Sequence, residues 1–520
     1  MNGAIVRLTL RQVRRSAIVV VVVTGGMTAL VAGTYRSVVT GPPERAQLAA
    51  IAGNRAIRTL FGTPSGLGDP GGFTVWRTGT VLALILGGWG VLVMTRISRG
   101  EEQSGRWDLL LSGRTTVSGV LGRQVAVLLT VMAAVWVVVA AGLLTAGVRG
   151  AALHATGLAL VGAAGVATAA GTAQLFASRA AATGVAAGLL GVGLLLRMVA
   201  DGFAGLAWLR WLTPLGLVEL SEPFGPGRWL PLLTLAVANA TPVGLAGRAG
   251  RWRDVRGARL GGPGRRRPSY ALLGSPAAFA LRRARLPIVA WSLGMGAFYL
   301  LIGLVAGSVT DLLRDNPRLA ELAEQGGATG LGTPAGYAAT LFVLLTMPAG
   351  GFVASRLAAF IGDEVAGRHA LACAGPVPRW RWLGAEMLAA GTGALVLALV
   401  AAVALWAGGS RLGPAAALAG AANVLPVVAL SLGAAVLAVG VAPRAVALLG
   451  AIPTIGGFLL VTLGEAVRMP GRLLTLSPYT HLAPVPARSP DLPAAAVMIA
   501  FAVLACTAGT VAYRRRDLGG

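Results

Sequence analysis

The sequence predicts an all-α polytopic membrane protein with twelve transmembrane helices in two parallel six-helix repeats. The 520 residues are 55% hydrophobic and 12% charged, whereas soluble domains carry about 25% charged residues. Apolar runs of about 20 residues, the length that crosses the core of a bilayer, recur from end to end. A charged motif that separates two such runs also occurs twice. These three observations together give the fold class.

The first half begins with a short basic helix over residues 4–15, which we expect to lie on the inner membrane surface. Its arginines are Arg7, Arg11, Arg14 and Arg15. The first span can serve as an uncleaved anchor, so no cleavable signal peptide is expected. The spans follow at about 17–35, 76–96, 121–147 and 151–177, with the fifth ending near 200 and the sixth near 247.

A basic, glycine-rich segment is predicted to be a cytoplasmic linker at 249–275, between a first half at 1–248 and a second at 276–520. Eight arginines lie between positions 248 and 267, which suits contact with water or anionic lipid. A second basic surface helix is expected at 279–285. The remaining spans are predicted at about 288–308, 337–357, 383–408, 414–441, 445–466 and 493–513.

Two charged turns are the most informative feature of the chain. The first turn contains Glu101, Glu102, Gly105 and Arg106, and the second contains Asp363, Glu364, Gly367 and Arg368, 262 positions later. Thr213-Pro214 and Ser477-Pro478 match at an offset of 264, and Arg253-Asp254 and Arg516-Asp517 at 263. Such offsets indicate tandem duplication. Since each half has an even number of spans, both halves have the same orientation about an axis normal to the membrane.

Each turn places a glutamate four residues before an arginine, Glu102 before Arg106 and Glu364 before Arg368, which predicts a helical ion pair. The helices are then expected to end at Gly113 and Gly375. One interpretation is a juxtamembrane helix with a solvated charged face. Retention of the motif in both halves favours a second interpretation, a docking point for a partner protein.

The charge distribution supports a membrane topology rather than nucleic-acid binding. All 44 basic residues are arginine, and the net charge is +25. With the proposed spans, 29 arginines and 8 acidic residues lie on the inner side, and 15 arginines and 11 acidic residues lie outside. This excess is the positive-inside pattern.

The residue inventory argues against enzyme chemistry within this chain. A phosphate-binding loop requires a lysine that reaches the phosphates, and the sequence has none. Cys373 and Cys506 are not expected to meet, and His154, His369 and His481 are isolated. We therefore predict no disulfide, no catalytic residues and no metal or cofactor bound by this chain.

The turns resemble the inner loops of ABC type-2 exporter permeases. The shared pattern is acid-Glu-x-x-Gly-Arg, an apolar run, and then glycine with Arg-Thr-Thr in the first copy or Pro-Val-Pro-Arg in the second. Together with Gly-Phe-Thr-Val-Trp-Arg-Thr-Gly before the second span, the layout is similar to actinobacterial permeases of the tetronasin-resistance, polyketide antibiotic exporter type. The second copy departs from the first because Asp363 replaces a glutamate, and Ala372 and Cys373 interrupt the apolar run.

This resemblance implies the membrane subunit of an ATP-driven exporter that works with two copies of a separate ABC ATPase, which would hold the ATP and Mg. The cargo would be hydrophobic drugs or polyketide-like antibiotics, moved by alternating access. The protein would be multi-pass in the bacterial cytoplasmic (inner) membrane with both termini cytoplasmic. The turns would be the ATPase-coupling loops. Trp291, Phe298 and Tyr299 are candidates for the substrate pathway, because spans 1 and 7 flank the central axis in the family.

Two other function classes stay open at this point. A proton-coupled secondary multidrug transporter also fits twelve spans in two parallel halves, but no carboxylate is expected near the middle of the membrane. A membrane scaffold or lipid-binding assembly factor is the third reading. The charged residues Arg197 and Glu386 lie near span ends, where they are expected to reach towards water.

Overall fold

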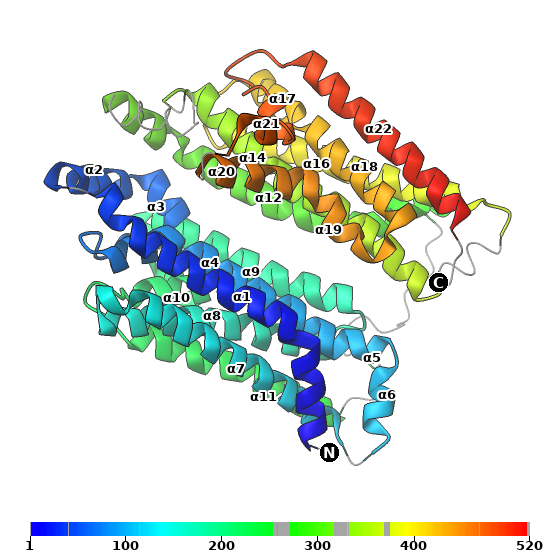
Figure 1. Cartoon of the computed structure of the whole chain (residues 1–520), viewed down its shortest axis with the longest axis horizontal. Helices are drawn as coiled ribbons and strands as arrows, with labels where there is room; N and C mark the ends of the chain where they lie inside the picture. Colours follow the sequence, from blue (N-terminus) through cyan, green and yellow to red (C-terminus); the bar gives the residue numbers. More distant parts are fainter. Residues whose placement is uncertain are drawn as a thin grey trace. The chain divides into compact units, whose positions relative to one another are not determined.

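The computed structural model describes residues 2–39, 41–113, 115–252, 257, 271–316, 330, 332–368, 375–466 and 469–516. In this part of the chain the regular structure is helical, without strands (Figure 1). Twelve of its helices are long and apolar enough to cross a membrane. The predicted fold class, an all-helical multi-pass membrane protein, is therefore confirmed. The chain divides into two compact units, Met1–Arg267 and Pro268–Gly520, which are described separately below.

The helices of the first unit follow one another with short connections. A π-helical segment, Arg96–Gly100, continues α4, and 3-10 turns lie at Leu144–Ala146 and Ala204–Leu212. The α-helices are α1 (Asn2–Val38), α2 (Pro42–Gly53), α3 (Arg55–Phe61), α4 (Pro70–Thr95), α5 (Glu101–Gln103), α6 (Arg106–Leu111), α7 (Val117–Leu143), α8 (Val148–Leu175), α9 (Arg179–Gly202), α10 (Pro214–Leu220) and α11 (Leu230–Trp252).

The second unit has more interrupted helices. Its tenth and eleventh candidate spans, Pro414–Val441 and Pro443–Thr462, are each made of shorter helical pieces. The α-helices are α12 (Pro276–Asp315), α14 (Pro334–Val365), α16 (Arg379–Ala407), α17 (Pro414–Asn423), α18 (Leu425–Val441), α19 (Val446–Ala451), α20 (Gly457–Ala466), α21 (Gly471–Leu474) and α22 (Leu492–Arg515). A π-helical segment, Ile452–Gly456, joins α19 to α20.

The basic segments that precede the first and seventh spans are not separate helices. Residues 4–15 form the first turns of the 37-residue helix α1, which bends in this part (Figure 1). Residues 279–285 likewise belong to the 40-residue helix α12, which continues through Pro287. No glycine or proline lies between Val6 and Val23 to end α1. The basic turns and the span therefore belong to one continuous helix. Their position relative to a membrane surface stays a prediction.

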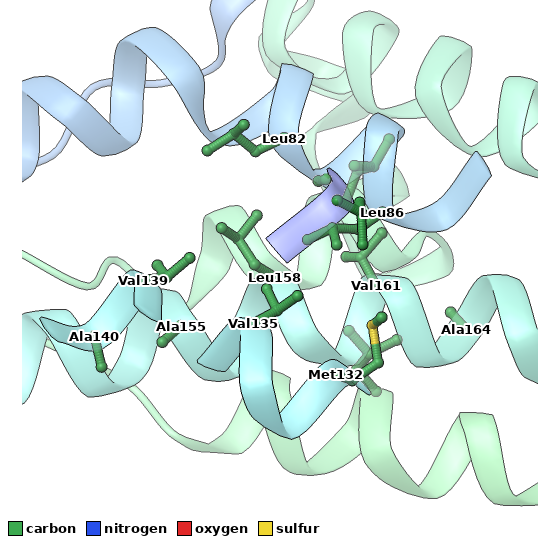
Figure 2. Close-up of a cluster of buried hydrophobic side chains, with 14 of the residues drawn as sticks. Leu82, Leu86, Met132, Val135, Val139, Ala140, Ala155, Leu158, Val161 and Ala164 are labelled. Carbon is green, nitrogen blue, oxygen red and sulfur yellow. The ribbon is translucent and has the colours of Figure 1, made fainter. Parts of the chain in front are cut away.

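The core of the first unit is formed where α4, α7 and α8 pack together. Leu82 and Leu86 of α4 belong to one buried cluster with Leu158 and Val161 of α8 (Figure 2). Met132, Val135 and Val139 of α7 belong to the same buried cluster. This cluster holds together the helix that leads into the first turn and two of its neighbours.

Glycines let the backbones of α4 and α8 come into direct contact. A Cβ atom on Gly165 would lie 2.2 Å from the carbonyl oxygen of Gly87, and one on Gly90 would lie 2.7 Å from that of Gly162. Small residues at such crossings are the usual means of helix association in a bilayer. The glycine abundance therefore has a local packing role between these two helices.

Candidate functional site

The first turn lies where α4 ends and the chain reverses. The π-helical segment Arg96–Gly100 leads into α5, which ends at Gln103. Gly105 then adopts a left-handed conformation with φ of +78°, and its N–H donates to the carbonyl of Glu102 at 3.2 Å. Glycine is suited to this conformation because it has no Cβ. A new helix, α6, begins at Arg106.

The second turn has the same left-handed glycine. Helix α14 ends at Val365, and Gly367 has φ of +70°. The N–H of Gly367 donates to the carbonyl of Glu364 at 2.9 Å, and the N–H of Arg368 donates to that of Asp363 at 3.0 Å. This is the Schellman arrangement that ends many helices.

These glycines make the predicted i,i+4 ion pairs wrong in both turns. Because the helix ends before the glycine, the arginine that follows is no longer on the face of the preceding helix. Arg106 instead pairs with Glu101, at 2.9 Å, and Arg368 pairs with Asp363, at 3.1 Å. Helix α6 ends at Leu111 with Ser112 as its C-cap, so Gly113 is the first residue beyond the cap, in agreement with the expected helix end.

Glu102 turns inward and pairs with Arg99, an arginine that the sequence analysis did not select. Their nitrogen and oxygen atoms are 2.8 Å apart, and the two side chains are 1% and 2% exposed. Arg99 also donates to the carbonyls of Ala177 at 3.1 Å and Gly257 at 2.9 Å. The three-residue spacing between Arg99 and Glu102 is the feature of the sequence that could have indicated this ion pair. The pair ties the turn to the segments that follow α8 and α11.

One face of helix α6 packs against its neighbours, and the other face is exposed. Trp107 is fully buried against Ile5 of α1 and Val117 and Val120 of α7. Leu109 is 80% exposed and Arg106 is 67% exposed. The first turn therefore presents an arginine and a leucine on a short helix that a buried tryptophan anchors.

The second turn is held by arginines from distant parts of its unit. Asp363 pairs with Arg283 of α12, and Glu364 pairs with Arg516, which follows α22. The backbone carbonyl of Arg516 accepts a hydrogen bond from Arg379 at 3.2 Å. No local spacing in the sequence indicated these partners.

The second turn also exposes an arginine and an apolar side chain, although the apolar residue precedes the glycine here and follows it in the first turn. Val365 is 83% exposed and Arg368 is 62% exposed, whereas Glu364 is 12% exposed. In each unit, the turn has an exposed arginine, an exposed apolar side chain, and a glutamate that forms an ion pair with an arginine inside the unit.

The predicted pathway residues divide into one buried and two more accessible side chains. Tyr299 is 1% exposed, donates to the carbonyl of Leu341 at 2.8 Å and stacks on Phe342. These contacts give Tyr299 a packing role in the second unit. Phe298 is half-buried against Tyr299, and Trp291 is exposed at the edge of Phe352. Their place in a substrate pathway stays a prediction.

Arg197 and Glu386 do not reach towards water as expected. Arg197 is 3% exposed and pairs with Asp201 at 2.6 Å and Glu219 at 3.0 Å. Glu386 is also 3% exposed and pairs with Arg356 at 2.6 Å. Arg197 has one counter-charge on its own helix α9 and one on α10, and Glu386 has its counter-charge on α14, so burial of both side chains becomes possible.

Several predictions fall outside the described residues. These are Arg114, Arg253, Asp254, His369, Ala372, Cys373 and Asp517, and most of the linker at 249–275. Among the residues that the structure describes, no group of three or more His, Cys, Asp or Glu could hold a metal ion.

Comparison with known proteins places the chain in a family. A family model described as "Multidrug efflux system permease Rv1217c, C-terminal domain" matches residues 273–514. The multidrug efflux system permease protein Rv1217c of Mycobacterium tuberculosis (strain ATCC 25618 / H37Rv) is 31% identical over 505 residues, covering 93% of this chain and 89% of that protein. The chain therefore belongs to the family of multidrug efflux permeases that this mycobacterial protein represents.

Proposed function

We propose that the chain is the membrane subunit of an ATP-driven ABC exporter, and that its two turns are the docking points for two copies of a separate ATPase. The observation that carries this proposal is the shared form of the turns. Each has an exposed arginine, Arg106 or Arg368, paired to an acid five residues earlier, and an exposed apolar side chain nearby. A surface of this kind suits contact with another protein.

Further local recurrences support the proposed tandem duplication. Gly66 and Gly330, 264 residues apart, both have a positive φ, of +68° and +75°. Three residues after each, Asp69 or Thr333 caps the N-terminus of the helix that leads to a turn. The proposed exporter would thus present one docking turn per repeat.

If ATP drives export, a separate polypeptide must bind and hydrolyse it. Without lysine, this chain has no residue for the phosphate-contacting position of a P-loop. We assign the ATP and Mg to the partner ATPase. We further propose that the cargo is hydrophobic drugs or polyketide-like compounds, moved by alternating access across the bacterial inner membrane, and that both termini are cytoplasmic.

The test uses charge reversal on the exposed side of each turn. The chain is co-expressed with each ABC ATPase subunit encoded in its own genome and purified through a tag on the permease. Arg106→Glu with Arg368→Glu is expected to lower the amount of co-purified ATPase about tenfold or more, which corresponds to about 1.4 kcal/mol or more.

A matched control reverses one equally exposed arginine in each unit away from the turns. Arg228 is 59% exposed and Arg314 is 63% exposed, and both have only long ion pairs of 3.8 Å. Arg228→Glu with Arg314→Glu should leave co-purification unchanged. Equal recovery of the ATPase with both double variants would refute docking at the turns.

A further inference from the structure

Two arginines of the first unit lie close together where α4 ends and α9 begins. Arg96 is the first residue of the π-helical segment that continues α4, and Arg179 is the first residue of α9. The hydroxyl of Thr183 in α9 donates to that of Thr95 in α4 at 2.8 Å, which joins the two helix ends. The guanidinium groups of Arg96 and Arg179 are near enough for their positive charges to repel each other.

Contacts with the neighbouring segments hold both arginines in place. The side chain of Arg179 lies across Gly100, because a Cβ on this glycine would be 3.1 Å from its Cδ and 3.7 Å from its Nε. The backbone N–H of Arg179 donates to Oε1 of Gln103 at 3.0 Å. Arg96 donates from Nη2 to the carbonyl of Gln12 in α1 at 3.0 Å. The two cations therefore stay together despite their repulsion.

No acidic side chain compensates this pair. Neither Arg96 nor Arg179 forms an ion pair with a carboxylate in the part of the chain that the structure describes. The two glutamates of the adjoining first turn are already paired with other arginines. Arg96 is half-buried and Arg179 is exposed. Like charges that are held together repel most strongly away from bulk water, so an anion that contacts both guanidinium groups would be bound favourably.

The position of the pair favours the phosphate of a lipid as this anion. Both arginines lie near the ends of candidate spans, Pro70–Gln103 and Arg179–Gly202, on the side that we propose is cytoplasmic. Leu92, one turn before Arg96 in α4, is 55% exposed, and Val185 of α9 is 39% exposed. Apolar surface thus adjoins the arginines and suits an acyl chain. Basic pockets between spans on the cytoplasmic side are a known means of binding anionic head groups.

We propose that Arg96 and Arg179 form a binding site for the phosphate group of an anionic phospholipid. Guanidinium groups bind phosphate through paired, charge-assisted hydrogen bonds. A free phosphate ion has the same chemistry, so the test separates the two sources. The second unit lacks the pair, because Ala358 occupies the position 262 residues after Arg96. We therefore expect a single site per chain.

The test measures the lipid that stays on the full chain, purified in detergent without an ATPase. The chain is incubated with phosphatidylglycerol or phosphatidylcholine and washed, and the retained lipid is measured by mass spectrometry. We expect a single phosphatidylglycerol per chain and no phosphatidylcholine, whose choline cancels the phosphate charge. Arg96→Gln with Arg179→Gln should lower retention about tenfold or more. Arg179→Gln alone, at an exposed position, should preserve the fold and lower retention about threefold or more.

A matched control removes the same charge from the same end of the unit. Arg7 and Arg11 are exposed on the first turns of α1, and Arg7→Gln with Arg11→Gln should leave retention unchanged. An equal loss with both double variants would overturn the proposal, because the attraction would then be diffuse.

Inorganic phosphate distinguishes the two sources of the anion. We expect an excess of inorganic phosphate to leave the bound phosphatidylglycerol in place. Its ready displacement would overturn the lipid assignment in favour of free phosphate. A double variant at Arg96 and Arg179 that retains phosphatidylglycerol but loses co-purified ATPase would also overturn it, since the arginines would then bind a protein carboxylate. Lipid retention is measured without the ATPase, so a failure of docking at the turns would not change this result.

Discussion

Neutralising Glu102 is expected to destabilise the first unit much more than neutralising its neighbour Glu101. Glu102 is the counter-ion of Arg99, and both side chains are at most 2% exposed. The Glu102→Gln substitution keeps the shape of the side chain but leaves a buried guanidinium without its charge partner. Removing one member of a buried ion pair costs about 3–5 kcal/mol.

The adjacent position supplies the control. Glu101 pairs with Arg106, whose side chain is 67% exposed, and ion pairs of exposed residues contribute about 0–1 kcal/mol. Glu101→Gln makes the same chemical change one residue away. The difference between the two variants therefore isolates burial, and we expect it to exceed about 2 kcal/mol from these two ranges.

The assay is unfolding of the purified chain in mixed micelles with increasing SDS, followed by helical circular dichroism. A third variant, Arg99→Met with Glu102→Leu, should recover most of the lost stability, because apolar replacement of a buried pair is often neutral. If Glu102→Gln and Glu101→Gln lose equal stability, the inward orientation of Glu102 is refuted.

Two further predictions use the same unfolding measurement. Tyr299→Phe removes the 2.8 Å hydrogen bond to the carbonyl of Leu341 and should cost about 1 kcal/mol; no loss would mean that the hydroxyl is not bonded there. Gly165→Ala places a Cβ 2.2 Å from the carbonyl oxygen of Gly87 and should cost about 1–3 kcal/mol. The control is Gly184→Ala, where no heavy atom lies within 4 Å of the added Cβ; it should be neutral or stabilising by up to about 1 kcal/mol. An equal loss of stability in Gly165→Ala and Gly184→Ala would contradict the close packing of α4 on α8.

The helices could be predicted well because the thickness of the bilayer core sets the length of each apolar run. Each apolar run of the required length corresponds to one of the twelve candidate spans in the described chain. The positions of the turns could be predicted for the same reason, since a charged motif between two spans must lie outside the apolar region. Membership of an efflux permease family was confirmed, whereas the ABC type-2 and tetronasin-resistance assignment stays a prediction.

The pairing of charges could not be predicted from local spacing. The i,i+4 rule assumes a continuous helix, and the left-handed Gly105 and Gly367 interrupt it. The partner of Glu364 is Arg516, 152 residues away, which only tertiary structure reveals. Glu386 was expected near water because no feature of the sequence indicated a buried partner. Its partner, Arg356, belongs to another helix.

We propose that ATP hydrolysis by a separate subunit drives export through this chain. The direct measurement is transport of a hydrophobic drug into inside-out vesicles that contain the purified permease and ATPase, with ATP and a proton gradient supplied separately. We predict drug accumulation with ATP and no gradient, and none with the gradient alone. Accumulation that requires only the gradient, and is unchanged when ATP or the ATPase is omitted, would contradict the account.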